Sequence, residues 1–148
     1  MRAFDRAFVD DTRAALATLE EDQVPEWGQM RPPQLFAHLK TAVAYSLGKE
    51  EETPSEGGFL GRHIVGPLLL NEILPMPKNV KAPKMYDAAM PSATLDEFME
   101  ELEAFLGAYE SNTLPDIAHP YFGAFGAEGW AKLHVLHVKH HSKQFGLS

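Results

Sequence analysis

Apolar residues recur at steps of three and four in four stretches of the chain, which predicts four amphipathic helices. The first helix is expected over residues 4–19, and the second over residues 27–47, with two adjacent prolines that suit a first helical turn. The third begins at Thr94, whose hydroxyl is placed to form a capping box with Glu97 three residues later. The fourth is expected over residues 127–144.

The segment between the second and third helices, residues 48–94, is long and irregular. Its apolar part, residues 59–74, is interrupted by glycines and a proline, which predicts broken helical turns. We expect residues 59–93 to form a lid or pocket wall, and the apolar stretch is a candidate homodimer surface. No stretch of strand length alternates with period two. The prediction is therefore an all-α fold: one four-helix-bundle domain over residues 1–148, with an irregular, partly helical insertion.

Charge and composition narrow the possible partners. The 148 residues include 21 acidic and 13 basic side chains, for a formal net charge of -8, and carry no basic stripe, which argues against nucleic acid as a partner. No stretch approaches the roughly 18 apolar residues of a membrane span, and the N-terminal sequence lacks the apolar core of a secretory signal. We therefore expect a cytoplasmic protein. The third helix is acidic and the fourth is basic, so their charges permit them to lie side by side.

Four histidines lie close together on the fourth helix, between positions 134 and 141. His137 and His141 are one helical turn apart, so they point the same way, as two ligands of one ion must. His38 lies on the apolar face of the second helix and is the natural third ligand, since inward imidazoles are costly without partners. The chain has no cysteine, so imidazoles and carboxylates must supply the ligands. Three protein ligands leave one coordination position open, which is the pattern of a catalytic site.

His134 shares the face of His137 and His141, and its role stays open among three alternatives. It can contact and orient one of the metal-binding histidines, serve as a metal ligand in place of one of them, or form part of a pocket wall. From its position it is also the best candidate for a general base. For His63 and His140 we favour a partly exposed or hydrogen-bonding role.

Four further residues are interpreted as structural. The loop containing His119 and Pro120 turns the chain into the last helix, and this reading is favoured over direct catalysis. Trp27 and Trp130 are interpreted as core or pocket-lining residues, because aromatic side chains dominate the cores of bundles.

Residues alone leave the function open between three classes. A bound ion could activate water for hydrolysis, or activate a small thiol that attacks an electrophile. In the second case the sulfur must arrive with a cosubstrate, because the chain has no cysteine. The third class is a non-catalytic bundle that binds a ligand or a protein partner.

Two passages resemble a known superfamily. Residues 27–39 read Trp-Gly-Gln-Met-Arg-Pro-Pro-Gln-Leu-Phe-Ala-His-Leu; residues 119–123 read His-Pro-Tyr-Phe-Gly, and after Trp130 residues 137–146 read His-Val-Lys-His-His-Ser-Lys-Gln-Phe-Gly. Together they are similar to an uncharacterised bacterial subfamily of the DinB-like (YfiT-like) metalloenzymes, in which tryptophan precedes the histidine-leucine pair of the second helix. Residues 48–94 are longer than the corresponding segment of the shorter members.

The resemblance implies a four-helix bundle with a divalent ion, typically zinc or nickel. Apart from the resemblance, iron is a third candidate for this site. The ion would be held by one histidine of the second helix and two of the fourth, here His38, His137 and His141. Characterised relatives include transferases and isomerases that depend on a low-molecular-weight thiol. The resemblance therefore favours a metal-dependent enzyme that transfers a small-molecule thiol to an electrophilic substrate.

Overall fold

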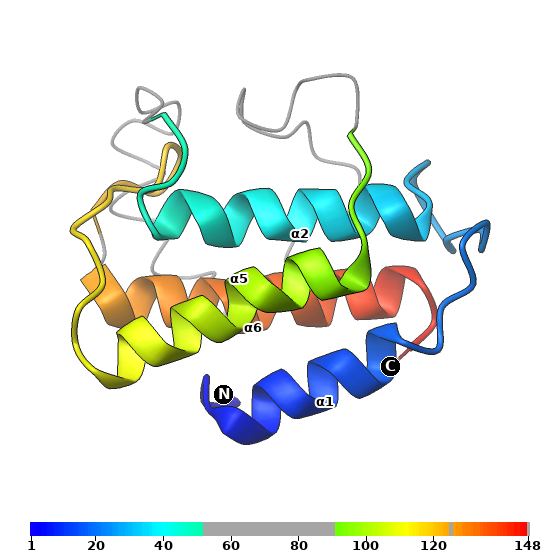
Figure 1. Ribbon diagram of the computed structural model, residues 1–148. Coiled ribbons are helices and arrows are strands. Elements are labelled where there is room, and N and C mark those ends of the chain that lie inside the picture. Colours follow the sequence, from blue (N-terminus) through cyan, green and yellow to red (C-terminus); the bar gives the residue numbers. More distant parts are fainter. Residues whose placement is uncertain (52–90, 125, 148) are drawn as a thin grey trace.

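The computed structural model describes residues 1–51, 91–124 and 126–147. These described residues form the helices α1 (Arg6–Leu16), α2 (Pro32–Ser46), α5 (Leu95–Glu110) and α6 (Gly126–Gln144), whose arrangement is seen in Figure 1. No strand occurs in these three ranges, where one antiparallel bridge joins His119 and Gly123. The predicted all-α fold of four packed helices is confirmed.

The starts of three helices follow from local side-chain chemistry. The Asp5 carboxylate accepts a hydrogen bond from the backbone N–H of Phe8 at 2.9 Å, so α1 begins at Arg6 rather than at residue 4. Prolines occupy the first turn of α2, as expected, but they also set its start, so the helix begins at Pro32 rather than at residue 27. The capping box of α5 is confirmed: Glu97 N–H donates to the Thr94 hydroxyl at 3.1 Å, and the Glu97 carboxylate accepts from Thr94 N–H at 2.9 Å.

Glycine ends α2 and α6. Gly48 and Gly146 have φ angles of 75° and 73°, in the left-handed region that glycine enters without steric cost. The N–H groups after each glycine bond back to the helix, Lys49 to Ala44 O at 3.0 Å and Leu147 to Ser142 O at 2.8 Å. This is the Schellman motif, which satisfies the last carbonyls and turns the chain away from the helix axis.

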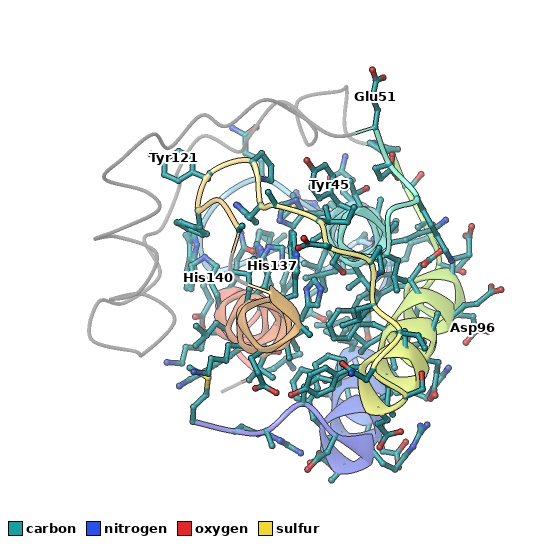
Figure 2. The ribbon with its side chains drawn as sticks, turned by 90° about the vertical axis from the view of Figure 1, so that its left-hand side faces the viewer. Tyr45, Glu51, Asp96, Tyr121, His137 and His140 are labelled. Atoms are coloured by element: carbon teal, nitrogen blue, oxygen red, sulfur yellow. The ribbon has the colours of Figure 1, made fainter. Side chains whose placement is uncertain are left out.

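The helices occupy the four corners of a bundle, seen end-on in Figure 2. α2 and α1 each pack against both α5 and α6, so α5 and α6 lie at opposite corners. Side chains from all four helices fill the centre, and those with at most 1% of their surface exposed include Val9, Leu16, Leu35, Tyr45, Phe98, Met99, Leu102, Phe105 and Leu106. Burial of this apolar surface is the main force that holds the bundle together.

The acidic and basic helices do not lie side by side, contrary to the arrangement that their charges permit. Acids of α5 pair instead with cations of α1 and of the residues after α2. Arg6 of α1 donates two hydrogen bonds to Glu103 at 2.6 and 2.7 Å, and Lys49 lies 2.9 Å from Glu101. Exposed pairs of this kind stabilise a fold by only about 0–1 kcal/mol each, so apolar packing rather than charge sets the helix order.

The expected broken turns of residues 59–74 and His63 lie outside the described residues, as do residues 59–90 of the expected lid. The proposed homodimer surface falls there as well. Over the described ranges, none of the helices is long and apolar enough to cross a membrane.

Candidate metal centre

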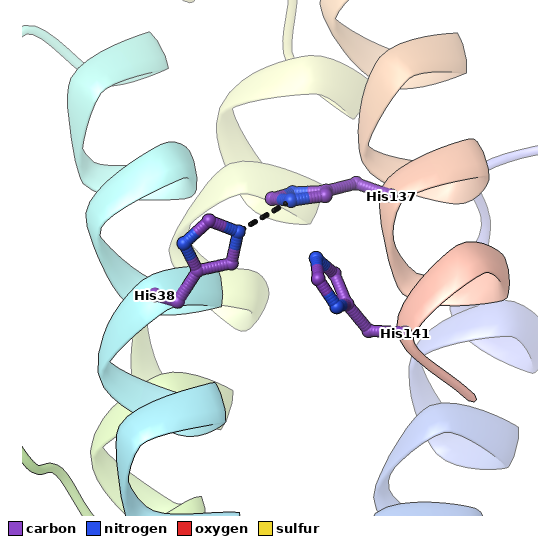
Figure 3. A group of neighbouring side chains, drawn as sticks. All are labelled: His38, His137 and His141. Atoms are coloured by element: carbon purple, nitrogen blue, oxygen red, sulfur yellow. Dashed lines mark hydrogen bonds between the residues drawn. The ribbon is translucent and has the colours of Figure 1, made fainter. Parts of the chain in front are cut away.

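Three imidazoles from two helices meet at one point between α2 and α6. His38 projects from α2 towards His137 and His141 of α6, as Figure 3 shows. Each pair of rings has its centroids 4.8 Å apart, and the Nε2 atoms of His38 and His137 are 2.9 Å apart. One ligand nitrogen from each residue lies within 4.8 Å of the other two. The structure thus brings together the three residues that the sequence predicted as ligands.

Burial keeps these imidazoles neutral. It is the largest cause of a lowered pKa at all three residues: to about 4 for His38, to about 3 for His141, and well below the ordinary value of 6.5 for His137. Neighbouring histidines lower these pKa values further, because a second positive charge is unfavourable so close to the first. At neutral pH each ring therefore has a lone pair, which a metal ligand needs.

The donor set fits a divalent ion. Zn–N bonds of about 2.0–2.1 Å place the ligand nitrogens of a tetrahedral site roughly 3.4 Å apart. The observed nitrogen separations, from 2.9 Å to at most 4.8 Å, bracket that value. Imidazole nitrogen is a suitable ligand for zinc, nickel and iron. The cluster is therefore a possible metal site, but its ligands do not identify which ion binds.

A glutamine lies behind His141. The Gln144 side-chain oxygen is 2.6 Å from His141 Nδ1, and its NH2 group donates to the Trp27 carbonyl at 2.9 Å. The sequence alone predicted no role for Gln144. The available signal was its spacing, since a residue three positions after a ligand lies next to it on the helix surface.

Comparison with known protein families gives one match, to a family described as "Protein of unknown function (DUF1569)", over residues 2–147. The chain belongs to the DUF1569 family. No curated protein and no solved structure matches it. The family description assigns no reaction, so the site of this DUF1569 protein has to be interpreted from its own residues.

In this DUF1569 protein His134 lies in the core and not in the three-histidine cluster. Its ring is 1% exposed and its Nε2 is 2.9 Å from the Ser46 hydroxyl, which itself donates to the Val43 carbonyl at 2.6 Å. The Ser46 hydroxyl therefore accepts from His134 Nε2–H. Aromatic rings surround it: Trp130 stacks at 5.6 Å and Phe105 meets it edge-on at 4.7 Å. These contacts favour a packing role, and the role of general base stays a prediction.

His119 is buried in the loop before α6 and fixes the turn there. Its Nδ1 accepts hydrogen bonds from the backbone N–H groups of Tyr121 and Phe122, at 2.9 and 3.1 Å. Burial lowers the pKa of His119 to about 3, so the ring stays neutral and able to accept. These contacts agree with the turn-forming interpretation of this loop.

Trp130 and His140 are residues of α6, whereas Trp27 lies in the segment before α2. Trp130 is 2% exposed and donates from its indole N–H to the Ile117 carbonyl at 2.7 Å, which makes it a core residue. The half-buried Trp27 ring meets His140 edge-on at 5.6 Å, and the His140 ring lies 5.0 Å from that of His141. His140 thus lies beside the cluster rather than in it.

Proposed function

We propose that this DUF1569 protein is a divalent-metal-dependent enzyme whose ion is held by His38, His137 and His141. The observation that carries the proposal is the convergence of three neutral imidazoles from two rigid helices, with a ligand nitrogen of each within 4.8 Å of the others. Imidazoles are strongly hydrated groups that cost free energy to bury, and an ion at this point would give all three a common partner. Zinc and nickel are the expected ions, with iron as a third candidate.

The charge of the site determines which ligand it prefers. Three neutral imidazoles leave the full positive charge of a divalent ion uncompensated, so an anion is favoured at the open fourth position. A bound ion would lower the pKa of a thiol or of a water molecule there and so supply a nucleophile near neutral pH. The protein's own contribution is to keep the three rings neutral, aligned and largely shielded from water.

Within this class we propose thiol transfer: a low-molecular-weight thiol binds as cosubstrate and loses its S–H proton to water. Its sulfur then forms a C–S bond to an electrophilic carbon of a small molecule, whose bond to a leaving group breaks and gives that group the electron pair. The chain has no cysteine, so the sulfur has to come from outside. Support comes from the resemblance of residues 27–39 and 119–146 to the DinB-like metalloenzymes, and the histidines lie on the second and fourth of the described helices as that resemblance implies.

Cobalt substitution tests the proposal directly. Protein reconstituted with Co(II) is titrated with small thiols and, separately, with hydrolysable esters, amides and phosphates, and the visible and near-ultraviolet absorption is recorded. A sulfur-to-cobalt charge-transfer band with a thiol, absent from the His38→Ala variant, is the expected result. Turnover of a hydrolysable substrate with no thiol band would overturn thiol transfer in favour of a hydrolase. Absence of any Co(II) spectrum characteristic of imidazole ligation would overturn the metal site and favour a binding bundle.

A further inference from the structure

Gln144 is the last residue of α6 and is almost fully buried, with 4% of its surface exposed. A buried primary amide has two donors and one acceptor oxygen that need partners. Its two contacts give those groups separate partners: the Trp27 carbonyl on one side and His141 Nδ1 on the other. We propose that Gln144 is a positioning residue that fixes which nitrogen of His141 faces the metal centre.

The orientation of the Gln144 amide follows from its hydrogen bond to the Trp27 carbonyl. A backbone carbonyl can only accept a hydrogen bond, so the atom 2.9 Å from the Trp27 oxygen has to be the NH2 group of Gln144. The amide oxygen therefore faces His141 Nδ1 at 2.6 Å. An amide oxygen can only accept, so Nδ1 of His141 carries the hydrogen.

The tautomer of His141 is then determined. A neutral imidazole has one N–H and one lone pair, and a hydrogen on Nδ1 leaves the lone pair on Nε2. In Figure 3 the Nε2 atom of His141, which is the ring nitrogen farther from its backbone, is directed towards His38 and His137. His141 therefore presents a ligand atom to the centre before any ion arrives.

The other two histidines differ in this respect. The Nε2 atoms of His38 and His137 are 2.9 Å apart in a hydrogen bond, so one of them carries a hydrogen. That hydrogen has to move to the Nδ1 of its ring before both rings can face a cation. His141 is thus the preset ligand of the three, and Gln144 is what presets it.

A second contact holds Gln144 itself in place. The backbone N–H of Glu26 donates to the Gln144 carbonyl at 2.7 Å, next to the bond from the Gln144 side chain to Trp27. The adjacent residues Glu26 and Trp27, which precede α2, therefore form hydrogen bonds with both the main chain and the side chain of Gln144. The segment at residues 26–27 couples the end of α6 to the ligand geometry, although it contributes no ligand.

The inference rests on the proposed metal function for its purpose, but its structural part can be measured separately. Partners behind a ligating histidine fix its tautomer and orientation, and their loss typically costs about 10- to 100-fold in metal affinity. Two substitutions separate this role from simple packing. Gln144→Met keeps an unbranched side chain of similar length and removes both hydrogen bonds, whereas Gln144→Glu keeps an acceptor for His141 Nδ1–H. Gln29→Met makes the same chemical change at an exposed glutamine and serves as the control.

The experiment combines nitrogen NMR with zinc affinity. Long-range ¹H–¹⁵N spectra of the protein in chelator give the tautomer of His141, assigned from the signals that disappear in His141→Gln. We expect the Nδ1–H form in the parent, Gln29→Met and Gln144→Glu, and a mixture in Gln144→Met. Zinc affinity by chelator competition should fall about 10- to 100-fold in Gln144→Met and change little in Gln144→Glu and Gln29→Met.

The outcomes separate this inference from the proposed function. An Nε2–H form in the parent would overturn the positioning role without any variant, even if Gln144→Met fails to fold. Unchanged tautomer and zinc affinity in Gln144→Met would overturn it and leave the metal site intact. A parent with the Nδ1–H form that binds no ion, together with a mixture in Gln144→Met, would support the orientation by Gln144 and refute the metal function.

Discussion

Buried His134 should make the protein sensitive to acid, and replacing it with glutamine should remove part of that sensitivity. Burial among aromatic rings is the largest cause that lowers the pKa of His134 from 6.5 to about 3. In the unfolded chain the imidazole regains its ordinary pKa, so between pH 6.5 and 3 the unfolded state binds more protons than the folded state. The free energy of unfolding therefore falls as the pH falls through this range.

The magnitude follows from the two pKa values. Each pH unit below 6.5 costs about 1.4 kcal/mol as long as the folded state stays unprotonated at this position. At pH 5 the loss from His134 alone is thus about 2 kcal/mol, which is a large part of the stability of a small domain. A glutamine at this position does not titrate, and its NH2 group can still donate to the Ser46 hydroxyl.

Urea unfolding at pH 7 and pH 5, followed by far-ultraviolet circular dichroism in chelator, measures this difference. The other titrating groups are common to both proteins, so their contributions cancel when the two pH-induced losses are subtracted. The parent should lose about 2 kcal/mol more than His134→Gln. Ser46→Ala is the control: it removes the hydrogen-bond acceptor and lowers stability at both pH values, but keeps the titrating ring. Equal losses in the parent and His134→Gln would refute the reasoning.

Three further predictions concern packing, helix capping and proton release. Phe98→Ala should lower the free energy of unfolding by about 3–5 kcal/mol in urea titrations, because Phe98 is fully buried and its loss leaves a cavity; a loss below about 1 kcal/mol would contradict the described core. Asp5→Ala should cost about 1 kcal/mol by removing the cap on Phe8 N–H, whereas Asp5→Asn should retain most of it. The pKa values of His38 and His141, lowered to about 4 and 3, leave both rings neutral at pH 7. Zinc binding measured calorimetrically at pH 7 in buffers of different ionisation enthalpy should therefore displace almost no protons from them, and release of more than the roughly one proton that a zinc-bound water can lose would contradict these pKa values.

Helix periodicity and local capping made much of the fold predictable. The capping box at Thr94 and Glu97 depends on residues close in sequence, and the structure has it as expected. The end of the first helix was less predictable: α1 stops at Leu16 although Leu19 continues the apolar spacing. Leu19 N–H instead bonds to the Leu16 carbonyl in a turn, at 3.2 Å. Periodicity shows which residues face the core but not where the helical hydrogen bonds stop.

Helix order within the bundle was not predictable from charge. α5 carries the acids and α6 the lysines, yet they lie at opposite corners. Exposed ion pairs contribute too little to choose between arrangements whose buried apolar surfaces differ. The order is set by how the apolar faces of all four helices fit together, which is a property of the whole chain.

The candidate site shows the same division between local and tertiary information. Helix geometry places His137 and His141 one turn apart on the same face, and the apolar residues around His38 show that it faces inwards. The three residues could therefore be named from the sequence. His134 shares that face but lies about 4.5 Å further along the axis than His137. At that level it meets Phe105, Trp130 and Ser46 instead of His38. Spacing defines direction around a helix, but depth along the bundle depends on the neighbouring helices.

Metal content tests the central claim most directly. Tag-free protein, reconstituted with zinc or nickel and freed of excess ion, is analysed by elemental mass spectrometry beside His38→Ala, His137→Ala and His134→Gln. We expect a stoichiometric divalent ion in the parent and in His134→Gln, and little in the two alanine variants, because each of these loses one of three ligands. A parent that retains no ion after reconstitution, or alanine variants that retain as much as the parent, would contradict the account.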